Sequence, residues 1–556
     1  MATKATGVTP VWRIAALSRV AMVLLMLTFD ALVDDYDTSG RLSPDDGVSG
    51  KSSVSDEHLR SPSSPLCAAV EGLVTWDAVY FQRISEVGYE HEQTHAFFPL
   101  IPAVTRGVAS ASSALAGATS SDGGNGMKTH PPPRVARCAR AASALLISNG
   151  AHVAAAVVLE RLGTLVLEGD DDDDGVHRVA RSAAVLFALN PASVFHSAPF
   201  YTESVFALAG FAGFYFLERG ARFASESATS ASVWNRNGAA LCFALACAAR
   251  SNGALNGLVL AHDFFARVLP SVAFGARGLE KNGLEKNKRR GKNAPGSLAS
   301  YVLPLFAATF AFAARCATML APLFAVQLYG YRTYCARALG AETPAWCGRW
   351  RPFPNVYAHV QSHYWNVGFL RYYEAKQIPN FLLAAPALAV SASAGRSWWT
   401  AFRSNTNARK RDENEPTDYS YAGASRRGGS RDGGGFPDKY KYASLKRKRN
   451  VAYGSERDAW MLSPSVRPYL FKWAVMSVVA LLVMHVQVTT RFLSVTPGIY
   501  WFLAKRGFAE AEREAAGERK RTSGKRRGVW RRAATLYSIS FFMLGALLFP
   551  TFYPWT

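Results

Sequence analysis

The chain has 556 residues and a formal net charge of +22; 49% of its residues are hydrophobic and 12% are aromatic. This length excludes a single ordinary globular domain. The positive charge does not indicate a nucleic-acid partner, because Lys and Arg concentrate in three segments that lie between apolar runs.

Apolar runs recur along the chain at lengths close to the roughly 20 residues with which a helix crosses a bilayer. The clearest are residues 11–33, 96–117, 141–159, 238–265, 303–326, 469–486 and 535–552. Shorter runs, or runs broken by proline, lie at residues 179–195, 202–217, 378–392 and 492–504. The pattern predicts an all-α polytopic membrane protein with about nine to eleven transmembrane helices.

Two of these regions leave a choice of topology. Residues 11–33 are longer than the apolar core of a typical signal peptide and no small-x-small cleavage site follows, so we expect a retained first helix. Across residues 178–217, Pro191 and Pro199 leave open either two full spans or a short re-entrant pair.

The charge of the segments between apolar runs predicts the orientation of the chain in the membrane. The basic segments are residues 276–297, 396–468 and 505–534. The positive-inside rule places them in the cytosol. Residues 34–95 carry 12 acidic and 4 basic residues and are expected in the lumen. We therefore expect one multi-pass domain over the whole chain, with a disordered luminal insert at 34–75 and a disordered basic insert at 396–468.

The seven cysteines show neither a CxxC pair nor the spacing of a zinc site. Cys335 and Cys347 fall in an aromatic segment that we place in the lumen. An oxidising lumen would permit a disulfide between them, and the sequence leaves its formation open.

The stretch WDAVYFQRISEVGYEHEQTHAFFPLIP, residues 76–102, contains HEQTH, which fits the zinc-protease pattern HExxH. That pattern needs a continuous helix, yet Gly88 precedes the motif, and Pro99 and Pro102 follow closely. No third ligand is evident. The sequence therefore predicts no metal site, and a membrane zinc protease is kept only as an alternative.

Asp77 is the better candidate for chemistry in this stretch. It precedes residues 78–84, which are predicted to form a short amphipathic helix on the luminal membrane surface. A carboxylate at such a position can accept a proton from an attacking sugar hydroxyl. The structural alternative is a helix cap or a loop salt bridge.

Other aromatic segments also carry single charges beside apolar runs. They are NPASVFHSAPFYTES (190–204), ARSNG (249–253), YAHVQSHYWNVGFLRYYEAKQIPNF (357–381), TRFLSVTPGIYWF (490–502) and the closing YPWT. Interfacial belts explain the aromatics. They do not explain Glu203, Arg250 and Arg371, because ionisable groups at membrane depth are costly and usually functional.

Taken in order, WDAVYF, the acidic residue before AFFPLIP, and these later segments closely resemble the PIG-V family of GPI mannosyltransferases. The resemblance spans residues 76–556. It implies a GT-C type glycosyltransferase of the endoplasmic reticulum membrane with a luminal active site. Such an enzyme would add the second mannose, in α-1,6 linkage and with inversion, to the glycosylphosphatidylinositol (GPI) precursor.

The resemblance also implies the reactants. The donor is dolichol-phosphate-mannose, the acceptor is a mannosylated glucosaminyl-phosphatidylinositol lipid, and no further cofactor is expected. It leaves open a small membrane partner subunit.

Carried onto this chain, the resemblance makes Asp77 the general base and Glu92 a residue that binds or orients the acceptor. Arg250 and Arg371 become candidates for the donor phosphate, because a guanidinium binds phosphate oxygens through two parallel hydrogen bonds. Glu203 is a further polar site residue that could pair with one of these arginines.

The remaining candidates for substrate binding are Trp76, Asn252, Tyr364 and Trp365. The aromatic ones could stack on sugar or pack against lipid, and composition does not separate these roles.

Three other functions make different predictions. A lipid or sugar transporter predicts internal repeats and polar residues spread over several helices, and the sequence shows no repeat. A zinc protease predicts loss of activity with a chelator. A non-catalytic subunit of a glycosyltransferase complex is disfavoured because Asp77 stands in an otherwise intact set of motifs.

Overall fold

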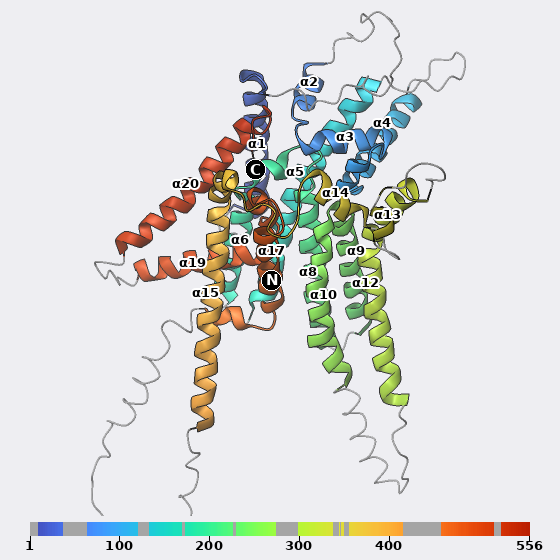
Figure 1. Ribbon diagram of the computed structural model, residues 1–556. Helices are drawn as coiled ribbons and strands as arrows, with labels where there is room; N and C mark the ends of the chain where they lie inside the picture. Colours follow the sequence, from blue (N-terminus) through green and yellow to red (C-terminus); the bar gives the residue numbers. More distant parts are fainter. Residues whose placement is uncertain are drawn as a thin grey trace, which may run out of the picture.

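The computed structural model describes residues 9–36, 64–119, 133–168, 173–225, 229–273, 299–336, 344, 346–349, 355–414, 458–515 and 524–555. Every regular element within these ranges is helical (Figure 1). This confirms the predicted all-α class, and it agrees with the requirement that a backbone in lipid satisfy its own hydrogen bonds.

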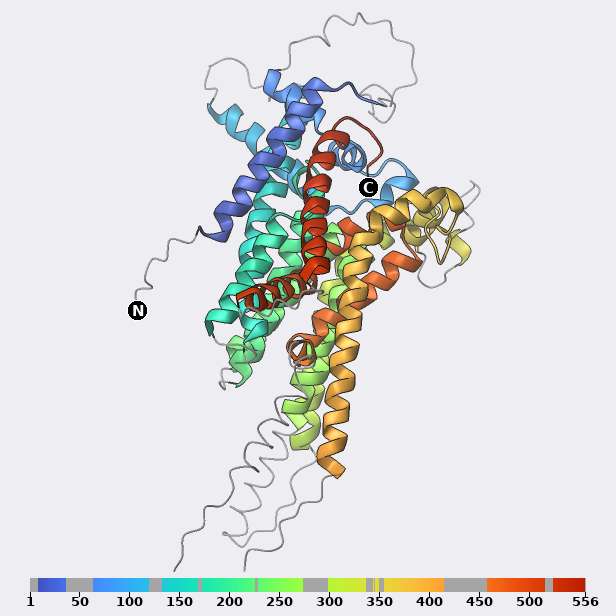
Figure 2. The same ribbon diagram turned by 90° about the vertical axis from the view of Figure 1, so that its left-hand side faces the viewer.

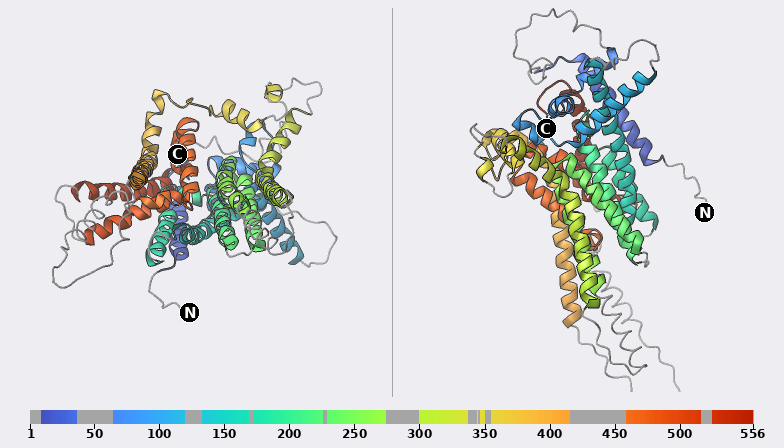
Figure 3. Two further views of the ribbon diagram at one scale, coloured as in Figure 1. Left: turned by 90° about the horizontal axis from the view of Figure 1, so that it is seen from below. Right: turned by 90° about the vertical axis from the view of Figure 1, so that its right-hand side faces the viewer.

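Longer helices form the body of the molecule. They are α1 (Val11–Leu32), α4 (Leu100–Thr119), α5 (Pro133–Leu167), α6 (Asp173–Ala188), α8 (Glu203–Ser225), α9 (Thr229–Ala249), α12 (Ala299–Tyr334), α15 (Ile378–Asn414), α17 (Arg467–Leu482), α19 (Pro497–Ala515) and α20 (Gly524–Leu548). Seen from below, α8, α9 and α10 appear end-on and next to one another (Figure 3).

Short helical elements connect them. They are α2 (Pro65–Gly72), α3 (Asp77–Val87), η1 (Glu92–Ala96), α7 (Ser193–Ser197), η2 (Ser251–Asn256), α10 (Gly257–Asp263) with the π-helical turn η3 (Phe264–Val268), α13 (Trp346–Arg349), α14 (Val356–Tyr364), η4 (Ala375–Gln377), η5 (Ala459–Leu462), η6 (Val486–Val488) and α18 (Thr489–Leu493). In Figure 1, α2 and α3 lie near the upper end, and α13 and α14 lie lower, at the upper ends of α8, α10 and α12.

Four of the described helices are long and apolar enough to cross a membrane. They are Val11–Leu32, Val135–Leu167, Val302–Tyr334 and Ala375–Ala408. The chain is therefore a multi-pass membrane protein, while the span count of nine to eleven stays a prediction. Figure 2 shows α1 rising from its first residue toward the upper end, and α15 descending to the lower end.

Two predicted apolar runs are interrupted in the structure. The run at 238–265 breaks where α9 ends at Ala249, because Arg250 adopts an extended backbone (φ −157°) before the 3-10 turn η2. The run at 179–195 breaks where α6 ends at Ala188. The five-residue helix α7 follows, and Pro191 and Pro199 on either side of it interrupt regular helix. Both breaks carry polar side chains of the candidate site.

The helices of the body approach closely where one of them carries glycine. A Cβ added to Gly213 of α8 would stand 2.3 Å from the Phe243 ring of α9, and one added to Gly163 of α5 would stand 2.9 Å from the Ala180 Cβ of α6. Without a strong hydrophobic force between helices in lipid, such close packing is a main source of attraction. A large apolar core, which includes Phe187, fills the space between these helices.

Two disulfides tie the upper elements together. Cys335 at the end of α12 bonds Cys347 of α13, so the bridge considered from the sequence is present. A second disulfide, Cys67 of α2 to Cys138 of α5, was not predicted. Disulfides form and persist in oxidising compartments.

A group of buried charges lies on the lower parts of α8, α9 and α10, and we call it the α8–α10 charge cluster. It comprises Glu218, Arg236, Asp263 and Arg267, with Tyr469 of α17 beside them. Arg236 Nε lies 2.7 Å from Asp263 Oδ2, and Arg267 Nη2 lies 2.9 Å from Glu218 Oε2. The Tyr469 hydroxyl donates to Glu218 Oε1 at 2.7 Å.

The predicted inserts overlap the described residues only in part. The segment 276–297 lies outside them, as do residues 37–63 and 415–457 of the inserts at 34–75 and 396–468. At the edges of these inserts the structure is helical, because α2 begins at Pro65 and α15 continues to Asn414.

Candidate active site

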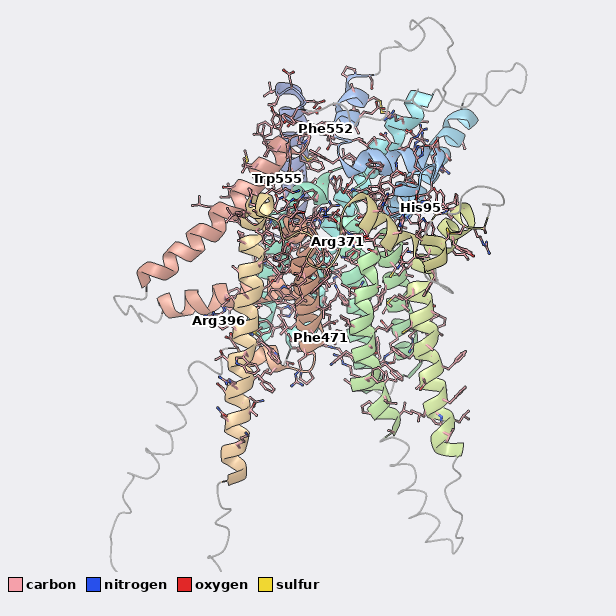
Figure 4. All side chains as sticks on the ribbon, in the orientation of Figure 1. His95, Arg371, Arg396, Phe471, Phe552 and Trp555 are labelled. Atoms are coloured by element: carbon pink, nitrogen blue, oxygen red, sulfur yellow. A yellow bond between two sulfur atoms is a disulfide. The ribbon has the colours of Figure 1, made fainter. Side chains whose placement is uncertain are left out.

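Asp77 is the first residue of α3. The preceding Trp76 has φ 55° and ψ −125°, a conformation that L residues rarely adopt, and this turns the chain sharply into the helix. The Trp76 ring lies 6.0 Å from that of Phe552, near the C-terminal end, labelled at the upper end of Figure 4. The Asp77 side chain keeps 40% of its surface exposed, and such strained positions are concentrated at functional sites.

Asp77 meets an arginine from a distant part of the chain. The Nη1 of Arg491, in α18, donates to Asp77 Oδ2 at 3.1 Å. The salt bridge considered as a structural alternative for Asp77 is thus present, but it is one member of a larger group. Arg491 Nε also donates to Oε1 of Glu203, the first residue of α8.

Glu203 joins the two arginines of this group. Its side chain has no exposed surface, and its Oε1 also accepts from Nη1 of Arg250. The pairing of Glu203 with an arginine, raised from the sequence, is therefore present. Its second oxygen, Oε2, is buried and has no hydrogen-bond partner within the described part of the chain. We call Asp77, Glu203, Arg250 and Arg491 the Glu203 cluster.

Aromatic rings and a histidine hold this cluster in place. The Arg491 guanidinium lies 4.9 Å from the ring centres of both Phe195 and Tyr201, within the range of cation–π attraction. The buried His196 contacts the hydroxyls of Ser204 at 3.2 Å and Ser494 at 3.0 Å. These bonds connect α7, α8 and the residue that follows α18, so the cluster has a rigid support.

The ARSNG turn presents Arg250 to the cluster. Gly253 permits the turn, because a Cβ there would stand 2.5 Å from the Cys247 backbone nitrogen. Asn252 lies in the same turn, and both its side-chain polar atoms are buried without a hydrogen-bond partner among the residues that the structure describes. Buried polar groups without partners are rare in native proteins, so Asn252 stands out within this turn.

Glu92 lies in a second group, with His359 and Tyr364 of α14, which we call the Glu92 cluster. Its Oε1 lies 3.1 Å from His359 Nε2, and its Oε2 accepts from the Tyr364 hydroxyl at 3.4 Å. Burial and the Glu92 carboxylate raise the pKa of Tyr364, so its hydroxyl remains a donor at neutral pH.

Trp365 packs beside this group. Its ring lies 6.1 Å from that of Phe97, and its carbonyl contacts His485 Nε2 at 2.6 Å. The residue is partly buried against an apolar cluster that includes Phe97 and Phe195. This favours a packing role for much of its ring.

Arg371 lies outside both clusters. Its Nη1 donates to the Ser362 hydroxyl at 2.6 Å, and its side chain is exposed. The surrounding loop instead caps α17, since the backbone nitrogens of Gly368 and Leu370 donate to Val483 at 3.2 Å and Leu482 at 2.7 Å. Arg371 and His95 both lie in the upper half of Figure 4. The structure thus brings Arg250, and not Arg371, to the Glu203 cluster.

The HEQTH motif does not form a zinc-protease helix. Its residues from Glu92 to Ala96 form a 3-10 helix, His91 is exposed, and His95 is fully buried. The His95 ring lies 4.7 Å from that of Tyr89, and burial lowers its pKa. Among the described residues no group of three or more His, Cys, Asp or Glu side chains could hold a metal ion.

Sequence reasoning missed Arg491. It lies in the TRFLS segment, whereas the sequence-based candidates for the donor phosphate are the arginines of the ARSNG and GFLRYY segments. A single arginine beside an apolar run is the signal that Arg250 and Arg491 share. That signal could have identified Arg491.

The family model and the relatives that match this chain agree on one family. A family model described as Mannosyltransferase (PIG-V) matches residues 8–273 and 299–556. Relatives named GPI alpha-1,6-mannosyltransferase 2 include the protein of Cricetulus griseus, 30% identical over 81% of this chain and 78% of the relative. The Mus musculus protein is 29% identical over 98% of both chains, and the Homo sapiens protein is 29% identical over 89% of this chain and 83% of its own.

Among solved structures, the apo oligosaccharyltransferase of Archaeoglobus fulgidus is 13% identical and covers 97% of this chain and 56% of its own, with a TM-score of 0.35. That score is too low to carry an argument. The family match, by contrast, spans nearly the whole chain and includes all four residues of the Glu203 cluster; the chain therefore belongs to the PIG-V family of mannosyltransferases.

Proposed function

We propose that this GT-C type mannosyltransferase transfers mannose from dolichol-phosphate-mannose to a mannosylated glucosaminyl-phosphatidylinositol lipid. The product is the α-1,6-linked second mannose of the GPI precursor. The names of the relatives, GPI alpha-1,6-mannosyltransferase 2, support this reaction. The observation that carries it is the Glu203 cluster, in which a half-exposed carboxylate and two arginines from distant segments meet at one buried carboxylate.

Asp77 acts as the general base. Arg491 holds Asp77 through Oδ2, and we assign the other oxygen, Oδ1, to the acceptor hydroxyl. As that hydroxyl attacks the anomeric carbon, its proton passes to Asp77 while the bond to the dolichyl phosphate oxygen breaks on the opposite face. One displacement of this kind inverts the anomeric configuration. Positioned general bases typically contribute about 10²–10⁴-fold to such a step.

The arginines stabilise the departing phosphate. Phosphate gains negative charge at the leaving oxygen, and preorganised donors aimed at that charge lower the barrier. Arg250 keeps 20% of its side chain exposed, so its remaining N–H groups are the first candidates for phosphate oxygens. Asn252, in the same turn, adds an amide donor.

The reaction takes place at the luminal face of the endoplasmic reticulum membrane. Support comes from the basic segments predicted for the cytosol and from the position of both disulfides. The proposal includes no cofactor and no metal, and it keeps a small membrane partner subunit as an expectation.

The test is complementation of cells that lack the second GPI mannosyltransferase. Wild type, Asp77→Asn and the control Glu90→Gln are compared at matched expression, and surface GPI-anchored protein is measured. Glu90 is a suitable control because Arg83 binds both its oxygens, at 2.7 and 3.0 Å, in the same segment of the chain. We expect rescue by wild type and Glu90→Gln, but not by Asp77→Asn.

Two results would contradict the proposal. Failure of the wild type would assign the chain to another transfer, and full rescue by Asp77→Asn would remove Asp77 as the base. A further variant, His91→Ala, tests the zinc alternative without disturbing the core, because His91 is exposed. We expect it to rescue fully and to be insensitive to chelators.

A further inference from the structure

Arg19 lies near the middle of α1, one of the helices that can cross the membrane, and only 2% of its surface is exposed. Every hydrogen-bond acceptor that the structure gives for its guanidinium is uncharged. A charged side chain at such a depth is costly, and as a rule it serves a function. Neither the Glu203 cluster nor the Glu92 cluster contains this residue, so its role needs a separate explanation.

The guanidinium of Arg19 is fully hydrogen-bonded. Its Nε donates to the Ser18 hydroxyl at 3.3 Å. Its Nη1 donates to the Ser193 carbonyl at 2.9 Å and the Ser197 hydroxyl at 3.0 Å. Its Nη2 donates to the Ala188 carbonyl at 3.3 Å and the Ser193 hydroxyl at 2.5 Å. These five hydrogen bonds need the planar fork of a guanidinium, whereas lysine presents all its donors on one nitrogen.

These contacts hold the corner between α6 and α7. Ala188 is the last residue of α6, and Ser193 and Ser197 are the first and last of α7. The carbonyls at the end of a helix have no donor within it, and Pro191 in this corner supplies none. From the other side, Asn149 Nδ2 of α5 donates to the Ser197 carbonyl at 3.0 Å. Since so short a helix is not stable alone, α7 keeps its place through α1 and α5.

The side chains of α7 in turn fix Arg491. The Phe195 ring lies 4.9 Å from its guanidinium. His196 Nε2 contacts the Ser494 hydroxyl at 3.0 Å, and that hydroxyl donates to the Arg491 carbonyl at 2.7 Å. The other ring nitrogen of His196 contacts the hydroxyl of Ser204, the second residue of α8, at 3.2 Å. A continuous path of contacts therefore leads from α1 through α7 to the Glu203 cluster.

We propose that Arg19 is a positioning residue for the Glu203 cluster, which acts through α7 on Arg491 and so on the carboxylate of Asp77. This inference rests on the proposed function, because it takes the Glu203 cluster as the reaction centre. The helix α1 then does more than anchor the chain in the membrane, since it fixes the geometry of the site. A displacement of about 1 Å, even from a change far from the reacting atoms, typically lowers a rate about 10²-fold.

The experiment compares Arg19→Lys, Ser197→Ala and the two changes together in the full-length protein in detergent. Mannose transfer is measured as kcat per folded molecule, and hydrogen–deuterium exchange is measured over residues 193–204. The control is Arg315→Lys, because Arg315 is also an almost buried arginine of a membrane-crossing helix. It donates to Asn237 Oδ1 at 2.9 Å, and no bond described in the structure connects it to α7.

We expect Arg19→Lys to lower kcat about 10²-fold and to speed exchange over residues 193–204. We expect Ser197→Ala to lower kcat about tenfold, the loss of one hydrogen bond to a charged group. The double change should lower kcat no further than Arg19→Lys, because the Ser197 hydroxyl then has no arginine N–H left to lose. The control should leave both kcat and exchange over these residues unchanged.

A role of Arg19 in folding alone would lower the yield of folded protein but not the rate per folded molecule. An unchanged kcat in Ser197→Ala and in any folded Arg19→Lys, with or without faster exchange, would overturn the inference and leave the proposed function standing. Effects of the two changes that multiply would also overturn it. If Arg19→Lys does not fold, Ser197→Ala decides, since it keeps the charge in place. A wild type that transfers no mannose would overturn the proposed function, and the inference with it.

Discussion

Glu203 binds two arginines through a single oxygen while its own side chain is completely buried. Removing one member of such a group leaves the others as uncompensated charges. We expect Glu203→Gln to lower the free energy of unfolding by about 3–5 kcal/mol, measured by thermal unfolding in detergent. The control is Glu168→Gln, because Glu168 pairs with Arg222 at the surface and such pairs contribute about 0–1 kcal/mol. If the two changes lowered the free energy of unfolding equally, Glu203 would not be compensating two buried arginines.

Arg491 reaches two carboxylates at once because its guanidinium presents several N–H groups in a fixed plane. Lysine carries the same charge on one nitrogen and cannot hold both partners in this geometry. We expect Arg491→Lys to lower mannose transfer by about 10²-fold, the typical effect of misplacing a reacting group by about 1 Å.

The assay for Arg491→Lys is transfer to a GPI precursor in microsomes. Arg467→Lys is the control, since Arg467 is an exposed residue that donates to the Leu462 carbonyl. Unchanged transfer by Arg491→Lys would show that charge alone suffices at this position.

The sequence allowed charged residues of the site to be selected, but it did not show which residues they contact. Asp77, Glu203 and Arg250 were selected by their charge beside apolar runs, and they meet in the structure. Arg371 satisfies the same criterion but lies in the loop that caps α17. Arg491 lies 414 positions from Asp77. A single sequence holds no signal for a contact at that distance.

Among the elements, the ARSNG turn depends on Gly253. Any Cβ there would stand 2.5–2.7 Å from backbone atoms of Ala246 and Cys247, which a helix cannot readily move. We expect Gly253→Ala to displace Arg250 and to lower both stability and transfer, measured by thermal unfolding and the microsome assay. Gly150→Ala is the control, because a Cβ there has no neighbour within 4 Å. A neutral Gly253→Ala would mean that the turn does not position Arg250.

The two disulfides differ in the length of chain that they close. Cys67–Cys138 joins residues 71 positions apart and Cys335–Cys347 residues 12 apart. The chain-entropy relation then gives about 4 and about 3 kcal/mol of stabilisation. We expect Cys67→Ser to lower the unfolding temperature more than Cys347→Ser. The reverse order would indicate that native-state contacts, such as the stacking of Trp346 on His359, dominate at the second bridge.

Apolar runs in the sequence predicted the long helices, but they did not predict where a run is interrupted by a turn. The run at 238–265 reads as one apolar span, yet it divides at Arg250 because the turn there is held by tertiary contacts. The Cys335–Cys347 bridge could be considered because both cysteines fall in one aromatic segment that the sequence places in the lumen. The Cys67–Cys138 bridge could not, since nothing in the spacing indicates that α2 lies beside α5.

For the whole molecule, the position of the disulfides and the charge of the loops agree on one orientation. The described ends of α12 and α15 that adjoin basic segments lie at the lower end, opposite α2 and α3 (Figures 1 and 2). We expect a glycosylation site inserted after Tyr36 to be modified, and one inserted within residues 276–297 to stay unmodified. The measurement is the mobility shift on a gel with and without glycosidase. Modification at the second site alone would invert the topology.

The α8–α10 charge cluster has a consequence for how the protein is made. Its charges lie on three successive helical segments. Glu218 pairs with Arg267, and Asp263 with Arg236, across these segments, while Asp263 also lies 3.7 Å from Arg267 in its own segment. A lone Asp or Arg at the centre of a membrane helix costs about 2.5–3.5 kcal/mol. Ribosome-coupled insertion of these segments one at a time would therefore be unfavourable. We expect α8, α9 and α10 to leave the translocon together, with their charges already paired. We expect α17 to pack against them afterwards through Tyr469.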